Sequence, residues 1–151
     1  MADRDATDVA GDPSPALRQD AAGEQPAVTL EAFLSQDDAH AVRLEAGDDA
    51  RALLPRLAQL KLVEISFPSF RDGRGYSAAR ILREAGFMGE LRAQGDVLVD
   101  QVPHMIRCGF NSFAPEAAID PEVLKRSVER YAAVYQRGAD AAEPVWRRRH
   151  G

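Results

Sequence analysis

Short strand-like runs that alternate with amphipathic helical segments constrain the fold of this chain more than any other feature. The clearest run, Leu62–Phe67, is rich in β-branched and aromatic residues, and the apolar residues of segment 76–85 that follows it recur at helical spacing. Gly86 ends that helical pattern. Alternating strands and helices predict a mainly parallel sheet, because each parallel connection needs a crossover.

The same strand and helix unit recurs along the chain. Strands are expected at residues 41–45, 62–67, 90–93 and 110–113. Thr29 caps a short first helix, Asp48 caps a helix that Pro55 should kink, Asp96 caps one that Gly109 closes, and Asp120 precedes a last helix that runs through Tyr131 and Tyr135 to Gly138. We therefore predict an α/β fold of about four mainly parallel strands, either half of a (β/α)8 barrel or a small flavodoxin-like sandwich.

Composition divides the 151 residues into three parts. Residues 1–27 are predicted to be a disordered acidic leader, residues 28–140 a single α/β domain, and residues 141–151 a flexible C-terminal tail. Residues 1–26 carry six acidic and two basic side chains, a net charge of −4 out of the total of −5. The remaining 125 residues are therefore nearly neutral and lack the basic field that attracts nucleic acid.

Several classes of protein are disfavoured by what the sequence contains. The leader does not have the basic and then apolar layout of a signal peptide, so a cytoplasmic location is expected. Charges interrupt every apolar run, so no membrane span is predicted. Cys108 is the single cysteine and rules out an internal disulfide, and the three histidines show no metal-ligand spacing.

The polar segment 67–77 (FPSFRDGRGYS) joins the best strand to its helix. Ligands of α/β sheets lie beyond the carboxyl ends of strands, so location makes this loop the leading candidate site. Gly73 and Gly75 permit unusual backbone conformations, and Arg71 and Arg74 lie where a helix N-terminus directs free N–H groups outward. An oxyanion is the expected ligand, whereas the alternative is a tight turn capped by Asp72 or Ser77.

Other chemical signals are weaker. Gly73, Gly75 and Ala78 match a dinucleotide fingerprint with Asp96 at a distance suited to a ribose, but five residues separate the strand from the first glycine. NAD(P) or flavin binding is therefore not favoured, and no cofactor is identifiable. Cys108 lies at a helix C-terminus, which disfavours a thiolate, so a packing role is expected.

Five ordered blocks resemble a bacterial family known as domain of unknown function 934. They are residues 67–77 (FPSFRDGRGYS), 89–93 (GELRA), 95–97 (GDV), 100–101 (DQ) and 107–110 (RCGF). At Val102-Pro103-His104 the chain departs from the family pattern, and Pro103 should bend the helix there. The resemblance marks Arg71, Asp72, Gly73, Arg74, Gly75, Ser77, Glu90, Arg92, Asp96, Asp100, Gln101, Arg107 and Cys108 as candidate site residues.

The resemblance implies a cytoplasmic protein commonly encoded beside assimilatory sulfite reductase and described as an oxidoreductase of sulfite reduction. Three hypotheses follow: an accessory protein that binds the reductase or another sulfur-assimilation protein, or handles an oxyanion near Arg71, Arg74 and Arg92; a small anion- or phosphate-binding enzyme that uses Asp72, Asp96 or Asp100 as acid or base; and a cofactor-dependent oxidoreductase. The exposed sheet edges of such a fold also predict a homo-oligomer as one possible assembly.

Overall fold

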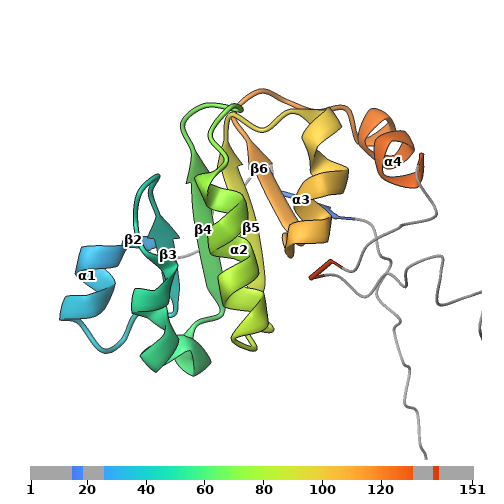
Figure 1. Ribbon diagram of the computed structural model, residues 1–151. Helices are drawn as coiled ribbons and strands as arrows, with labels where there is room; N and C mark the ends of the chain where they lie inside the picture. The colour runs from blue at the N-terminus through green and yellow to red at the C-terminus, as the bar shows by residue number, and fades with distance from the viewer. Residues whose placement is uncertain (1–14, 19–25, 131–137, 140–151) are drawn as a thin grey trace, which may run out of the picture.

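A single open sheet of six parallel strands forms the centre of the protein (Figure 1). The computed structural model describes residues 15–18, 26–130 and 138–139. In chain order the elements are β1 (Ala16–Leu17), β2 (Val28–Thr29), α1 (Leu30–Ser35), β3 (Ala41–Leu44), the 3-10 helix η1 (Ala50–Gln59), β4 (Leu62–Phe67), α2 (Arg74–Glu84), β5 (Glu90–Gly95), the 3-10 turn η2 (Val99–Gln101), α3 (Val102–Cys108), β6 (Ser112–Pro115) and α4 (Pro121–Glu129).

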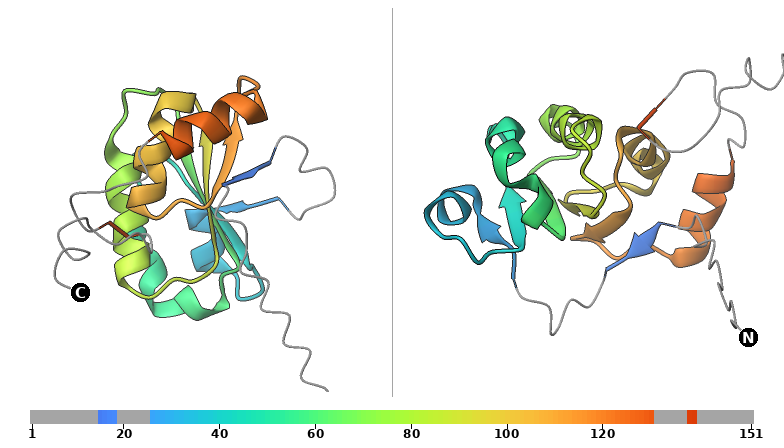
Figure 2. Two further views of the ribbon diagram at one scale, coloured as in Figure 1. Left: turned by 90° about the vertical axis from the view of Figure 1, so that its right-hand side faces the viewer. Right: turned by 90° about the horizontal axis from the view of Figure 1, so that it is seen from below.

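The strand order distinguishes the two predicted architectures. The strands lie in the order β1-β6-β5-β4-β3-β2, so the chain moves steadily across the sheet from β2 to β6. A flavodoxin-like sheet reverses direction at a switch point and carries helices on both faces. Here η1, α2 and α3 lie side by side on one face, as the view along the sheet shows (Figure 2). From β2 to β6 the order is that expected of a half barrel, and β1 adds a further strand beside β6.

The main core lies between this sheet and its row of helices. Alternate residues of the central strands are fully buried toward the helices, for example Val63, Leu91 and Phe113, each 0% exposed. Leu82 of α2 and Met105 of α3 are equally buried from the helical side. Burial of large apolar side chains stabilises a fold by about 1.5–3 kcal/mol each, so this layer fixes the sheet and the loops at its ends.

Most predicted elements are present, with three differences. The sheet has six strands because the two-residue strands β1 and β2 extend its edges. β1 lies in the segment predicted to be a disordered leader, and its pairing with β6 shows that this prediction is wrong for residues 16–17. The last strand, β6, begins two residues later than expected. Runs as short as β1 and β2 contain too few residues to show a strand period.

The helix ends follow local sequence signals in most places. Thr29 and Asp120 accept hydrogen bonds from Ala32 N and Glu122 N, so both predicted caps are confirmed. η1 has a kink at Arg56, directly after Pro55, as predicted. Its N-cap is Asp49 and not the predicted Asp48. Asp96 caps no helix, and Pro103 bends none, because it lies in the first turn of α3, where proline is tolerated. The predicted course through Tyr131 and Tyr135, and the tail, lie outside the described residues.

Candidate functional site

The predicted loop lies at the carboxyl edge of the sheet, between β4 and α2. At the same edge are the connection from β3 to η1 and the segment that follows β5, because all strands of the sheet are parallel. In Figure 1 the connections after β4 and β5 lie together at the top of the sheet, and the connection after β3 lies lower and to the left. Residues 68–73 therefore lie beyond the end of β4, as predicted.

Asp72 and Arg74 form a two-pronged ion pair within this loop. Arg74 Nε lies 3.0 Å from Asp72 Oδ1, and Arg74 Nη2 lies 2.6 Å from Asp72 Oδ2. The backbone N–H of Arg74, the first residue of α2, also donates to Asp72 Oδ1 at 3.1 Å. The hydrogen bonds donated by the Arg74 side chain, and then that from its backbone, lower the pKa of Asp72 from 3.8 to about 2.

This pair changes the chemistry expected of the loop. An oxyanion was predicted to bind the arginines and the amides at the start of the helix, yet the Asp72 carboxylate already bonds to Arg74 and to the first amide of α2. The same hydrogen bonds raise the pKa of the Arg74 guanidinium. An external anion at Arg74 would have to displace an internal one, so the geometry gives the anion-binding hypothesis less support than the sequence did.

The two loop glycines have different roles from those predicted. Neither Gly73 nor Gly75 has a positive φ, so the prediction of special backbone conformations is wrong. A Cβ at Gly75 would lie 2.6 Å from Cζ of Phe67 and 2.9 Å from Cγ2 of Ile65, whereas one at Gly73 would meet nothing within 4 Å. Gly75 is therefore needed because the first turn of α2 packs directly on β4.

Asp96 and Gln101 hold the backbone of Phe70 from both sides. The N–H of Phe70 donates to Asp96 Oδ2 at 2.8 Å, and the carbonyl of Phe70 accepts from Gln101 Nε2 at 2.7 Å. Asp96 is itself anchored, since its N–H donates to the Phe67 carbonyl at 2.8 Å. Asp96 was predicted to cap a helix, but one of its carboxylate oxygens instead accepts a hydrogen bond from the Phe70 backbone. This contact gives no support to the prediction that Asp96 lies beside a ribose.

Gly95, the last residue of β5, allows this bracing. Its φ of +101° lies in the left-handed region, and a Cβ there would approach the Phe67 carbonyl oxygen to 2.5 Å. The chain can therefore turn directly after β5 and bring Asp96 against residues 67–70. The sequence block Gly95-Asp96 is explained by this turn.

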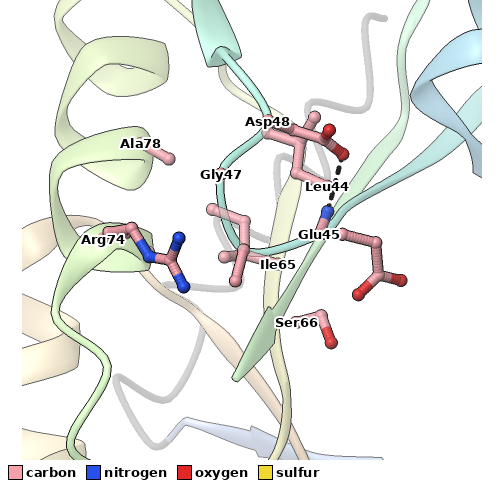
Figure 3. A pocket seen from close by; sticks show the side chains of 10 residues that line it. Leu44, Glu45, Gly47, Asp48, Ile65, Ser66, Arg74 and Ala78 are labelled. Carbon is pink, nitrogen blue, oxygen red and sulfur yellow. Dashed lines mark hydrogen bonds between the residues drawn. The ribbon is translucent and has the colours of Figure 1, made fainter. Parts of the chain in front are cut away.

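A small pocket lies between the loop after β3 and the start of α2 (Figure 3). The Arg74 side chain points toward it, and it is closed on the other side by Gly47 and by Asp48, whose carboxylate accepts from Glu45 N at 2.8 Å. Its volume of about 20 Å³ is roughly the space of one water molecule. As it stands, this pocket has no room for an organic substrate.

Two other candidate residues, Glu90 and Arg92, lie away from the loop. They project from β5 onto the sheet face opposite the helices, where Arg92 Nη2 lies 3.0 Å from Glu90 Oε1 and Arg92 Nη1 lies 3.5 Å from Glu64 Oε2. Arg43 Nη2 completes the row at 2.6 Å from Glu64 Oε1. Arg43, Glu64 and Arg92 are aligned by the strand register itself. Arg92 is thus not part of an anion site with Arg71 and Arg74.

Neighbouring groups on this face lower the pKa of the Glu90 carboxyl. Burial tends to raise the pKa of Glu90, but interactions with the Ser112 hydroxyl and Arg92, and the charges of Arg92 and Arg18, together hold it below its usual value. Sequence reasoning missed Glu64, which is 5% exposed. The available signal was a glutamate in the middle of an otherwise apolar strand, a residue type that is seldom buried unless it is paired.

The remaining candidates are spread over α2, η2 and α3. Ser77 and Asp100 are exposed, and Arg107 accepts a hydrogen bond from Ala139 N through its carbonyl at 2.7 Å. Cys108 is 6% exposed and its Sγ lies 3.8 Å from His104 Nε2. Burial, followed by the charge of Cys108, raises the pKa of nearby Tyr76. The structure thus places most of the thirteen candidates in a braced loop, an ion-pair row and the end of α3, and it leaves Ser77 and Asp100 exposed on α2 and η2.

No group of three or more histidine, cysteine, aspartate or glutamate side chains in the described ranges is placed to hold a metal ion. No helix in the same ranges is both long and apolar enough to span a membrane.

Fold and site together define a singly wound parallel α/β protein with a braced surface loop at the carboxyl edge of the sheet. The chain belongs to a bacterial family of unknown function: residues 41–146 match the model described as "Bacterial protein of unknown function (DUF934)". The matched range contains all thirteen candidate residues. Comparison with curated proteins and with solved structures gave no match.

Proposed function

We propose that this protein is an accessory protein of assimilatory sulfite reduction that acts by binding another protein of the pathway, with sulfite reductase as the first candidate. The pathway rests on the resemblance of the sequence blocks to a family encoded beside that enzyme. The binding role rests on one structural observation: hydrogen bonds from Asp96 and Gln101 hold Phe70 at the carboxyl edge, where its ring is 38% exposed.

A braced and exposed aromatic residue suits recognition better than catalysis. Holding a loop in one conformation lowers the entropy that binding must overcome, and aromatic and arginine side chains dominate the energetics of protein interfaces. By contrast, the charged groups that a reaction at the loop would use, Asp72 and Arg74, are bonded to each other. The alternative of a small anion- or phosphate-binding enzyme, or of an oxidoreductase with its own cofactor, therefore has less support.

Direct binding between purified proteins tests this function. The full chain is immobilised and purified sulfite reductase is passed over it at low ionic strength, with an unrelated acidic protein of similar size as the control. We expect the reductase to be retained and the control to pass through. Loss of retention at low salt, where electrostatic attraction between the two proteins is strongest, would contradict the proposed function.

A further inference from the structure

Two residues with exposed apolar side chains, Phe70 and Leu98, have their backbones held by the same side-chain amide. Gln101 Nε2 donates to the Phe70 carbonyl at 2.7 Å, and Gln101 Oε1 accepts from the Leu98 N–H at 3.3 Å. Phe70 and Leu98 are 38% and 42% exposed, so both side chains can be reached from solvent. One side chain thus links the backbones of two residues whose apolar side chains are exposed.

The charge at this position is also defined. The Arg71 guanidinium lies 5.4 Å from the centre of the Phe70 ring and forms no ion pair within the part of the chain that the structure describes. Arg74, the neighbouring arginine, is neutralised by Asp72. Among the residues that the structure describes, Arg71 is therefore the arginine of this loop that has no ion-pair partner, and it lies next to an apolar ring.

Asp100 makes the exposed charge differ between the two ends of the surface. It lies between Leu98 and Gln101 in the sequence, is exposed, and forms no ion pair among the described residues. At the Phe70 end the exposed charge is that of Arg71, beside the half-buried Asp96 carboxylate that accepts from the Phe70 N–H, whereas at the Leu98 end the exposed charge is that of Asp100. An acidic group of a partner is favoured at the first end and disfavoured at the second.

We infer that Phe70, Leu98 and Arg71 form a docking surface for a protein segment that carries an apolar side chain next to a carboxylate. This inference rests on the proposed function and names the part of the surface that the reductase contacts. The apolar side chain would pack between Phe70 and Leu98, and the carboxylate would pair with Arg71. Nucleic acid is a less suitable occupant, because a single unpaired arginine neutralises too little phosphate charge.

The variants that test this surface separate its three parts. Phe70→Ala removes the ring, Arg71→Ala removes the charge, and Gln101→Ala removes the amide that places Phe70 and Leu98. Met88→Ala is the matched control, because Met88 is 91% exposed but lies at the opposite end of the sheet, before β5. Melting temperatures are recorded for each variant, so that a loss of binding is not confused with a loss of folding.

Affinity for purified sulfite reductase is then measured with the full-length variants at low and high salt. We expect Phe70→Ala to weaken binding at least about tenfold and Arg71→Ala about threefold to tenfold, the latter effect shrinking at high salt, with Met88→Ala unchanged. If the wild-type protein binds the reductase and both Phe70→Ala and Arg71→Ala bind it with undiminished affinity, the docking surface is overturned but the proposed function is not. Absence of wild-type binding would overturn the proposed function and the surface with it, as would binding that nuclease treatment abolishes.

Discussion

The carboxylate of Asp96 accepts a hydrogen bond from the backbone N–H of Phe70 at 2.8 Å, across 26 residues of chain. This contact ties the end of β5 to the loop that follows β4. It gives the sequence block Gly95-Asp96 a mechanical role in keeping the loop in place.

Replacing Asp96 with alanine should loosen the loop more than the rest of the fold. A hydrogen bond to a charged group contributes about 1.5–3 kcal/mol, so we expect the free energy of unfolding to fall by roughly 2 kcal/mol. Amide exchange measured residue by residue should accelerate at Phe70 and Arg71 while the core strands remain protected. Asp96→Asn keeps an acceptor oxygen and should show a smaller effect; equal exchange in both variants would contradict the proposed contact.

Asp72 should remain ionised well below the pH at which most aspartates are protonated. Hydrogen bonds from Arg74 lower its pKa from 3.8 to about 2 in the folded state, so the pair's contribution to stability is complete above about pH 4 and is lost as the pH falls through about 2. Titration of the carboxyl carbon by NMR should give a midpoint near pH 2. In Arg74→Ala the midpoint should move toward 3.8, and an unchanged midpoint would exclude Arg74 as the cause.

Gly75→Ala should destabilise the protein where Gly73→Ala does not. The added methyl group at position 75 would lie 2.6 Å from the Phe67 ring, so α2 or the ring must shift, at a cost of about 1–3 kcal/mol. At position 73 the space is open, and the change should stay within about 1 kcal/mol. Chemical denaturation of both variants provides the comparison; similar losses at the two positions would argue against tight packing of α2 on β4.

Glu64→Ala should be among the most destabilising changes of a charged residue in this chain. It leaves Arg92, whose side chain is 5% exposed, without one of its carboxylate partners, and breaking a buried pair typically costs about 3 kcal/mol or more. Glu84→Ala is the control, because Glu84 pairs with Arg80 on the exposed face of α2, and such pairs contribute about 0.5 kcal/mol or less. Thermal unfolding that is no more affected by Glu64→Ala than by Glu84→Ala would refute a structural role for the row.

Local signals were sufficient for much of the fold. The period and composition of Leu62–Phe67 predicted β4, helical spacing predicted α2, and Asp120 with Pro121 marked the start of α4. These signals act between residues a few positions apart, so they are readable without knowing what packs on what. The position of the 67–77 loop at a sheet edge followed as well, because all the strands were predicted to run in parallel.

The sequence by itself therefore determined the class of fold and the loop on which attention should rest. Only the tertiary structure decided that Asp96 and Gln101 hold Phe70, that Asp72 occupies the guanidinium of Arg74, and that Arg92 aligns with Glu64 on the far face of the sheet. The Asp96, Gln101 and Arg92 pairings join residues 26 to 31 positions apart, and they depend on strand order, on register and on the direction of each side chain, which are set by the packing of the whole sheet. The ion pair between Asp72 and Arg74 is local in sequence, but either side chain had other potential partners. The conformation of the folded loop determines that they pair with each other.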